Sequence, residues 1–260
     1  MQAPGSAQTP REMPDPKGRT AFVTGAANGL GAAIARSLLD VGCSVAIADI
    51  DARGNARAFN DLGGDAERLQ TVELDLGDRN SLTSGFAAAV ERWGAIDILV
   101  NNAAIAKATS IWTIEPEEWD RVIAVNLTGL FYLTRLAAAP MRDRGFGRVI
   151  NIASLAGQMA RPSGAHYAAS KGGVLALTRV FAAELAQSGV TVNAVAPAIL
   201  DTPMLKTVSE ERLGRLIDAI PVKRVGRPEE VAALVCFLAS SAAGFITGAT
   251  YDINGGMLMR

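Results

Sequence analysis

The chain has 260 residues, of which 49% are hydrophobic and 20% are charged, and its formal net charge at pH 7 is −1. This balance predicts a globular protein with enough apolar residues for a sizeable core, and it excludes a largely disordered chain. Because the net charge is near zero and lysine and arginine form no block, we expect neither nucleic acid nor a membrane as a partner.

The first 18 residues contain four prolines and no apolar run, which predicts a disordered tail rather than a signal peptide. Residues 19–260 contain no linker, so we expect a single domain there. Cys43 and Cys236 lie far apart without a CxxC spacing, which indicates reduced core residues in a cytoplasmic protein. No cluster of His, Cys, Asp and Glu in the sequence resembles a metal site.

From residue 20 onward, short β-branched runs alternate with longer segments of helical periodicity. The expected strands are 20–24, 44–48, 69–74, 96–100, 148–153, 190–195 and 250–253. The expected helices are 29–41, 52–62, 78–93, 117–144, 167–187 and 228–239. This alternation predicts an α/β fold, a single doubly wound, Rossmann-like parallel sheet with helices on both faces. Residues 203–227 interrupt the alternation and predict a mobile lid.

The first expected strand runs into a glycine-rich turn, TGAANGLG at residues 24–31. Glycine lets the turn be tight and lets backbone N–H groups approach a pyrophosphate at the start of the next helix. Since the turn lies between an expected strand and an expected helix, it predicts a dinucleotide site. The residues assigned to this site are Gly25, Asn28, Gly29, Leu30 and Gly31.

Asp49 follows the second expected strand, where a carboxylate can accept hydrogen bonds from an adenosine ribose and would repel a 2′-phosphate. The glycine turn contains no Arg or Lys to neutralise such a phosphate. Both features favour NAD over NADP. The alternative is that Asp49 only caps the next helix, a role that Asp51 could also fill.

Tyr167 and Lys171 are four residues apart at the start of an expected helix, so their side chains share one face. The neighbouring ammonium would lower the pKa of Tyr167 from its ordinary value near ~10. Ser154 follows the fifth expected strand, where its hydroxyl could hold a substrate oxygen. Taken singly, these residues have plain structural explanations, a surface helix pair and an N-cap. His166, the only histidine, occupies an adjacent helical position and is interpreted as structural.

Together these segments resemble the classical short-chain dehydrogenase/reductase family over about residues 17–260. The matching segments are residues 24–31, Asp75-Leu76, NNAA at 101–104, Val125-Asn126, Ser154, Tyr167-x-x-x-Lys171 and residues 197–202. The resemblance implies an NAD(H)-dependent oxidoreductase that transfers hydride between nicotinamide and a secondary alcohol or ketone.

The resemblance also implies roles for single residues. Tyr167 is the general acid in reduction and the general base in oxidation, while Lys171 lowers its pKa and holds the nicotinamide ribose. Ser154 orients the substrate oxygen, and Asn126 stabilises a helix kink and anchors a proton-relay water. The further cofactor contacts implied are Asp75, Leu76, Asn102, Ala103, Ala104, Pro197, Ile199, Leu200 and Thr202.

Two positions depart from the family pattern. The usual Asn-Asn-Ala-Gly ends in Ala104 here, whose methyl group requires a negative φ, and the frequent Pro-Gly is Pro197-Ala198. Neither change removes a reacting group, so we expect catalysis to be retained.

The expected substrate contacts are neutral, namely Gln158, Met159, Met204 and Leu205, and they favour an apolar or hydroxylated substrate. Lys206 could instead meet a carboxylate. An alternative is a 3-oxoacyl-thioester reductase of the acyl-CoA type, or 3-hydroxyacyl dehydrogenase. The segments at 225–230 and 252–256, near the end of the chain, resemble such enzymes. Further alternatives are a non-catalytic NAD-binding regulator and a lyase or epimerase that uses NAD transiently.

Family members mostly form tetramers through two long helices, here about residues 119–144 and 167–187. These segments are rich in Ala, Leu and Val on more than one face, which suits a helix-bundle interface. We therefore expect a homotetramer.

Overall fold

The computed structural model describes residues 16–160, 162–203, 205 and 209–259. Its centre is a seven-stranded sheet in the order β3-β2-β1-β4-β5-β6-β7, and every pair of neighbouring strands is parallel. The strands are β1 (Thr20–Thr24), β2 (Ser44–Asp49), β3 (Leu69–Glu73), β4 (Ile98–Asn101), β5 (Gly147–Ile152), β6 (Val190–Pro197) and β7 (Thr250–Ile253). The predicted doubly wound α/β fold is confirmed.

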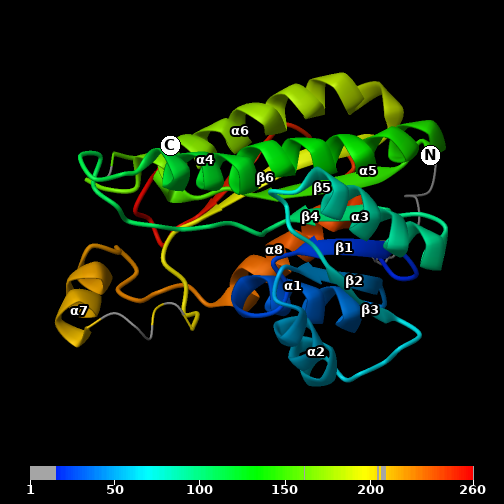
Figure 1. Ribbon diagram of the computed structural model, residues 1–260, viewed down its shortest axis with the longest axis horizontal. Helices are drawn as coiled ribbons and strands as arrows, with labels where there is room; N and C mark the ends of the chain where they lie inside the picture. The colour runs from blue at the N-terminus through cyan, green and yellow to red at the C-terminus, as the bar shows by residue number, and fades with distance from the viewer. Residues whose placement is uncertain (1–15, 161, 204, 206–208, 260) are drawn as a thin grey trace, which may run out of the picture.

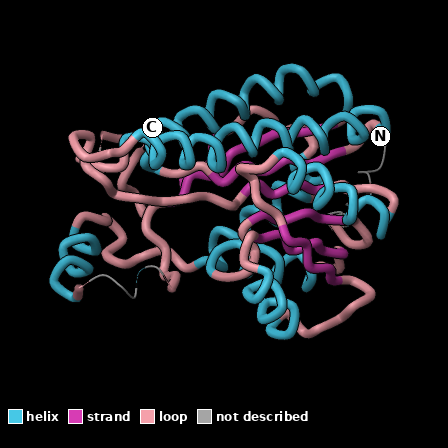
Figure 2. The backbone as a smooth tube through the Cα atoms, in the orientation of Figure 1, coloured by secondary structure: helices cyan, strands magenta, loops and turns pink. Residues whose placement is uncertain are grey.

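Helices cover both faces of this sheet (Figures 1 and 2). The helices are α1 (Gly29–Asp40), α2 (Ala52–Asp61), α3 (Arg79–Trp93), α4 (Pro116–Ile123), α5 (Leu130–Arg144), α6 (Ala165–Leu185), α7 (Glu210–Asp218) and α8 (Pro228–Ala239). Helices α1 and α8 pack on one face, and α3, α5 and α6 pack on the other. Strands β5 and β6 are buried along their whole length because both faces are covered.

The strand order reverses beside β1, because the chain leaves β3 at one edge and returns to place β4 on the other side of β1. Crossovers in opposite directions leave a crevice at the carboxyl ends of the strands, and this crevice is where ligands bind in such folds. The topology therefore brings the glycine turn after β1 next to the segments that follow β4 and β5.

The long helix predicted at 117–144 differs from a regular α-helix. Between α4 and α5 the chain forms a π-helical segment, η1 (Ala124–Gly129), which contains Asn126. Gly129, the last residue of this segment, packs closely against the chain after β3. A Cβ at Gly129 would lie 2.3 Å from the carbonyl oxygen of Leu76. A π-helical turn of this kind is often found at functional sites.

The continuous helical stretch Pro116–Arg144 is also, by length and composition, long and apolar enough to cross a membrane. Half of its most apolar window is buried inside the fold, and α5 packs on the sheet through Leu133, Ala137 and Met141. Burial of this kind is typical of a core helix in a globular protein.

The predicted tail and lid are only partly covered by the described residues. Residues 1–15 lie outside them, but residues 16–18 do not behave as a tail: Pro16 is buried, and its carbonyl accepts a hydrogen bond from Cys43 Sγ at 3.2 Å. The expected lid at 203–227 contains α7, which stands apart from the sheet layers in Figure 1. Its mobility stays a prediction.

Candidate functional site

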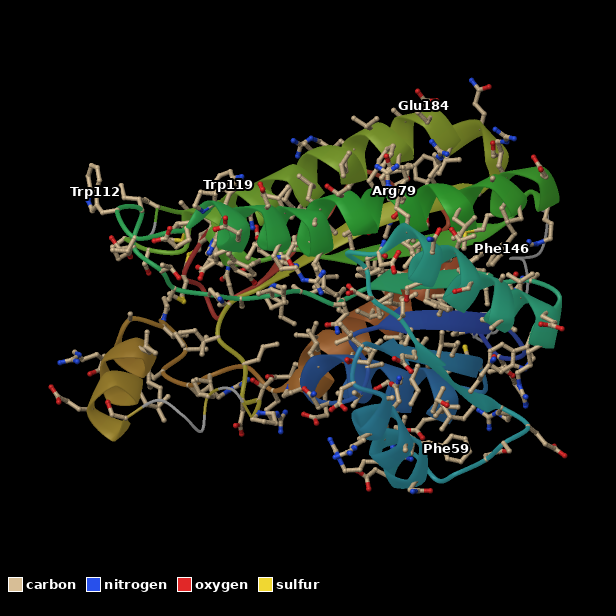
Figure 3. All side chains as sticks on the ribbon, in the orientation of Figure 1. Phe59, Arg79, Trp112, Trp119, Phe146 and Glu184 are labelled. Carbon is tan, nitrogen blue, oxygen red and sulfur yellow. The ribbon has the colours of Figure 1, made fainter. Side chains whose placement is uncertain are left out.

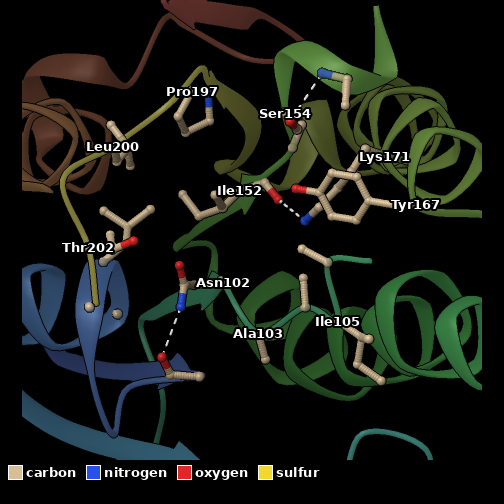
Figure 4. A pocket seen from close by; sticks show the side chains of 18 of the residues that line it. Asn102, Ala103, Ile105, Ile152, Ser154, Tyr167, Lys171, Pro197, Leu200 and Thr202 are labelled. Carbon is tan, nitrogen blue, oxygen red and sulfur yellow. Dashed lines mark hydrogen bonds between the residues drawn. The ribbon is translucent and has the colours of Figure 1, made fainter. Parts of the chain in front are cut away.

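A cavity of about 1060 Å³ opens at the carboxyl ends of β1, β2, β4, β5 and β6 (Figure 4). Most of the residues predicted for the cofactor and catalytic site line it. They are Gly25, Asn28, Gly29, Leu30, Gly31, Asp49, Asp75, Leu76, Asn102, Ala103, Ala104, Ser154, Tyr167, Lys171, Pro197, Ile199, Leu200 and Thr202.

The glycine turn is held in place by the segment that follows β4. Asn102 Nδ2 donates to the carbonyl oxygens of Thr24 and Gly25 at 2.9 and 3.0 Å, and the Thr24 hydroxyl accepts from two backbone N–H groups of that segment. Gly31 has no room for a side chain, since a Cβ would lie 2.1 Å from the carbonyl oxygen of Gly25. These contacts place the start of α1 against the cavity, where its first N–H groups can meet a phosphate.

Asp49 ends β2 and joins two backbone segments at the cavity wall. One carboxylate oxygen accepts from the N–H of Ala27 in the glycine turn at 3.2 Å, and the other accepts from the N–H of Asp51 at 3.1 Å. The N-cap of α2 is Asp51, so Asp49 is not the helix cap. Its carboxylate remains part of the cavity wall, where a ribose hydroxyl can reach it.

Asp75 is paired with a residue that the sequence did not indicate. Arg121 on α4 places Nη2 3.0 Å from both carboxylate oxygens of Asp75, and one of these oxygens also accepts from the N–H of Gly77 at 2.7 Å. Both side chains line the cavity. The pair joins positions 46 residues apart, so no local spacing could have predicted it.

Ala104 adopts the backbone expected for it. Among the described non-glycine residues, only Lys223 has a positive φ, so the alanine in place of the family's glycine is not strained.

Lys171 and Tyr167 project from the first turns of α6 into the cavity. Lys171 is buried and donates to the carbonyl oxygen of Ile152 at 2.6 Å, and its Nζ lies 5.8 Å from the centroid of the Tyr167 ring. Burial lowers the pKa of Lys171 from 10.5 to about 8, because the charged ammonium loses solvation. Figure 4 shows the Tyr167 hydroxyl beside Ile152, on the side of the cavity where Ser154 lies.

Ser154 follows β5 and caps the short helix η2 (Leu155–Gly157). Its Oγ accepts from the N–H of Ala156 at 3.1 Å. A hydroxyl that accepts through a lone pair keeps its own hydrogen for donation, so the cap leaves Ser154 able to donate to a substrate oxygen.

Asn126 does not line the cavity but lies directly behind it. Its Oδ1 accepts from the N–H of Ile105 at 2.8 Å, and its Nδ2 donates to the Ile105 carbonyl at 2.9 Å and to Ser170 Oγ at 3.2 Å. Asn126 therefore ties the kinked helix to the loop after β4 and to α6. Its proton-relay role stays a prediction.

The residues predicted to contact the substrate have different outcomes in the structure. Met159 and Leu205 line the cavity, whereas Met204 and Lys206 lie outside the described residues. The Gln158 prediction is not supported, because its Nε2 donates to Oδ1 of Asp252 on β7 at 2.7 Å and the residue does not line the cavity. Met257, which sequence reasoning did not place at the site, also lines the cavity.

The wall of the cavity has a part with charged residues and a part that is mostly apolar. Among the described residues that line it, the charged ones are Asp49, Asp75, Arg121 and Lys171. The part formed by the segment after β5, the α7 region and the chain end is apolar apart from small hydroxyl groups. A neutral, largely apolar group fits this part, since a charged group would lose solvation without gaining a partner.

Comparisons with known proteins show that the chain is similar to reductases and dehydrogenases. A family model described as enoyl-(acyl carrier protein) reductase matches residues 25–258. The acetoacetyl-CoA reductase of Rhizobium meliloti (strain 1021) is 43% identical over 239 residues, which cover 92% of this chain and 98% of that protein.

Two solved structures from Brucella melitensis have the same fold. A 3-ketoacyl-(acyl-carrier-protein) reductase complexed with NADH is 33% identical, with a TM-score of 0.87 and coverage of 94% of this chain and 99% of that one. A short-chain dehydrogenase/reductase of the glucose/ribitol dehydrogenase type is 34% identical, with a TM-score of 0.88 and coverage of 95% and 100%.

Proposed function

The chain belongs to the short-chain dehydrogenase/reductase family, and its relatives act on CH–OH groups or on the corresponding ketones. We propose that it is a cytoplasmic NAD(H)-dependent oxidoreductase acting on a secondary alcohol or ketone. The observation that carries this proposal is the meeting of Ser154, Tyr167 and Lys171 in one cavity with the glycine turn. This arrangement combines a proton donor, a hydrogen-bond donor for the substrate oxygen and a dinucleotide cradle.

The residues divide the chemistry between them. A bound nicotinamide would supply hydride in reduction and accept it in oxidation. Tyr167 would pass its hydroxyl proton to the substrate oxygen in reduction and take that proton back in oxidation. Lys171 would stabilise the phenolate that results, and Ser154 would donate a hydrogen bond to the same oxygen.

The preference for NAD rests on charge at the adenosine end. Asp49 would repel a 2′-phosphate. Of the cations among the described wall residues, Arg121 is paired with Asp75, and Lys171 lies at the Tyr167 end. The Brucella melitensis relative that was solved with NADH also supports this preference.

A 3-oxoacyl thioester of the acyl-CoA type is the second candidate substrate. It is favoured by the 43% identity to an acetoacetyl-CoA reductase and by the apolar substrate end of the cavity. A non-catalytic regulator is disfavoured, because Ser154, Tyr167 and Lys171 are all retained.

The deciding experiment is a panel of polyols, hydroxysteroids, aryl carbinols and 3-hydroxyacyl thioesters, offered with NAD⁺ and with NADP⁺ and followed by NADH or NADPH absorbance. We expect turnover of one class of the panel, with kcat/KM at least ~10-fold higher with NAD⁺, equivalent to about 1.4 kcal/mol. Higher efficiency with NADP⁺ would refute the cofactor assignment. NADH binding without any turnover would favour the regulator, and conversion without a change in absorbance would favour a lyase or epimerase.

We also propose a homotetramer that uses the outer faces of the long helices. A shallow groove there is lined by Leu127, Thr128, Phe131, Tyr132, Gly173, Ala176, Leu177 and Val180. An apolar groove formed by two helices is well suited to a second copy of the same helices. Gel filtration is expected to give four times the 27.1 kDa chain mass.

The Val180→Arg variant should dissociate this tetramer. Val222→Arg is its matched control, because Val222 is equally exposed, 56% against 57%, but lies outside the groove. A wild-type protein that elutes at the monomer mass would contradict the assembly.

A further inference from the structure

Glu118 on α4 joins three segments beside the cavity. Its Oε1 contacts the Thr109 hydroxyl and, at 2.8 Å, His166 Nε2, while Oε2 accepts from Lys107 Nζ at 2.9 Å. These hydrogen bonds, from Thr109 first, then His166 and Lys107, lower the pKa of Glu118 from 4.5 to about 2. The carboxylate is therefore ionised near neutral pH.

His166 is completely buried between this carboxylate and the backbone of Tyr167. Its Nδ1 accepts a hydrogen bond from the N–H of Tyr167 at 2.8 Å. A ring nitrogen that accepts carries no proton, so in this geometry the single proton of the neutral ring lies on Nε2 and is donated to Glu118. The two contacts together select one tautomer.

The contact with Tyr167 satisfies a requirement of the helix start. Helix α6 begins after Gly164, which has no side chain to serve as a cap. The N–H of Tyr167 lies in the first turn and has no carbonyl partner within the helix. The imidazole of His166 takes that hydrogen bond in place of a cap.

The loop that borders the substrate end is fixed by the same group. Gly164 donates its N–H to the carbonyl of Thr109 at 2.8 Å, and the side chain of Thr109 reaches Glu118. Earlier residues of this loop, Ala104 and Ile105, line the cavity. Figure 3 shows Trp112 and Trp119 at the end of the molecule where this loop meets α4.

We infer that Glu118 and His166 are positioning residues for the reaction. Neutral His166 is oriented by Glu118 and holds the backbone N–H of Tyr167, while Glu118 also holds the loop after β4 through Lys107 and Thr109. This inference rests on the proposed role of Tyr167 in proton transfer. A displacement of about 1 Å at a reacting group can cost ~10²-fold in rate, so loss of either contact should be visible in kcat.

Two substitutions separate the two contacts. His166→Asn places an oxygen near the position of Nδ1 and loses the reach to Glu118, whereas His166→Gln places a donor near Nε2 and loses the acceptor for Tyr167. We expect each to lower kcat by ~10-fold or more and His166→Phe to lower it further, with the KM for NADH changed less than about two-fold. Glu118→Gln should retain more activity than Glu118→Ala, because it keeps an acceptor oxygen.

The matched control is Asp78→Ala. Asp78 satisfies the first turn of α3 by accepting from the N–H of Asn80 at 2.9 Å, but it does not line the cavity. A purely structural role for His166 predicts that its variants behave like this control, with lower stability and wild-type kcat. That result would overturn the inference.

A measurement on the wild-type protein keeps the test valid if the variants fail to fold. Since the chain has one histidine, the side-chain ¹⁵N spectrum reports its tautomer without ambiguity. We expect a protonated Nε2 and an unprotonated Nδ1 at pH 8; a proton on Nδ1 would overturn the inference. A wild-type protein that turns over no substrate would instead count against the proposed function, and the spectrum would still stand.

Discussion

Tyr167→Phe is expected to lower kcat by about 10²–10⁴-fold, the usual scale for general acid–base catalysis. The substitution removes only the hydroxyl group, which lies in the cavity beside Ser154 and is proposed to exchange a proton with the substrate oxygen. The ring that packs near Lys171 remains, so the shape of the site should be retained. The measurement is kcat with the best substrate of the panel, together with an NADH titration by fluorescence.

Tyr251→Phe is the matched control for this variant. Tyr251 lies on β7, is partly buried and does not line the cavity, so removal of its hydroxyl should leave kcat within about two-fold of wild type. A Tyr167→Phe enzyme with near-wild-type kcat would refute the assigned acid–base role. Loss of NADH binding in that variant would point instead to a collapsed site.

Lys171→Met should also lower kcat by ~10²-fold or more, because the ammonium stabilises the phenolate that forms on Tyr167. Methionine fills a similar volume without the charge, so the apolar packing of α6 should be kept. In contrast with Tyr167→Phe, we expect the KM for NADH to rise as well, since the resemblance assigns Lys171 a contact with the nicotinamide ribose. An unchanged kcat would contradict the stabilising role of the ammonium.

The same substitution has a second expected result, in stability. The pKa of Lys171 is lowered to about 8 in the folded protein from the ordinary 10.5, so between these pH values the unfolded chain binds more protons than the folded one. The free energy of unfolding of wild type, measured relative to Lys171→Met, should therefore rise between pH 8 and pH 10.5. The full rise is about 3 kcal/mol, at about 1.4 kcal/mol for each pH unit between the two pKa values.

Urea unfolding at intervals across this range measures the difference. Lys17→Met serves as the control for the loss of one lysine, because Lys17 is exposed. A difference between wild type and Lys171→Met that stayed constant from pH 8 to pH 10.5 would mean that Lys171 is solvated in the folded protein.

The cofactor end and the substrate end of the cavity differ in how far sequence could predict them. Residues 24–31 form the expected turn between β1 and α1, because glycine spacing acts over a few residues and requires only that a strand precede it and a helix follow. The tyrosine and lysine of α6 share a face for the same reason, since a four-residue spacing is set by the helix itself. Both features are local.

The predicted role of Gln158 was not supported because its partner lies far along the chain. Gln158 turns to Asp252, 94 residues away, rather than to the cavity. Its local surroundings gave no indication of this, because Asp252 reaches it only after β7 has joined the sheet edge beside β6. A polar side chain next to a cavity takes the strongest acceptor within reach, and sequence alone does not identify that acceptor.

The alternation of strands and helices, the position of the glycine turn and the shared face of Tyr167 and Lys171 could be predicted from the sequence, because periodicity and short-range sterics act within a few residues. The pairing of Arg121 with Asp75, the contact of Glu118 with His166 and the π-helical turn at Asn126 became visible only in the folded structure. The two side-chain contacts join positions 46 and 48 residues apart. They form only when the packing of α4 and α6 on the sheet brings charged and polar groups within hydrogen-bond distance.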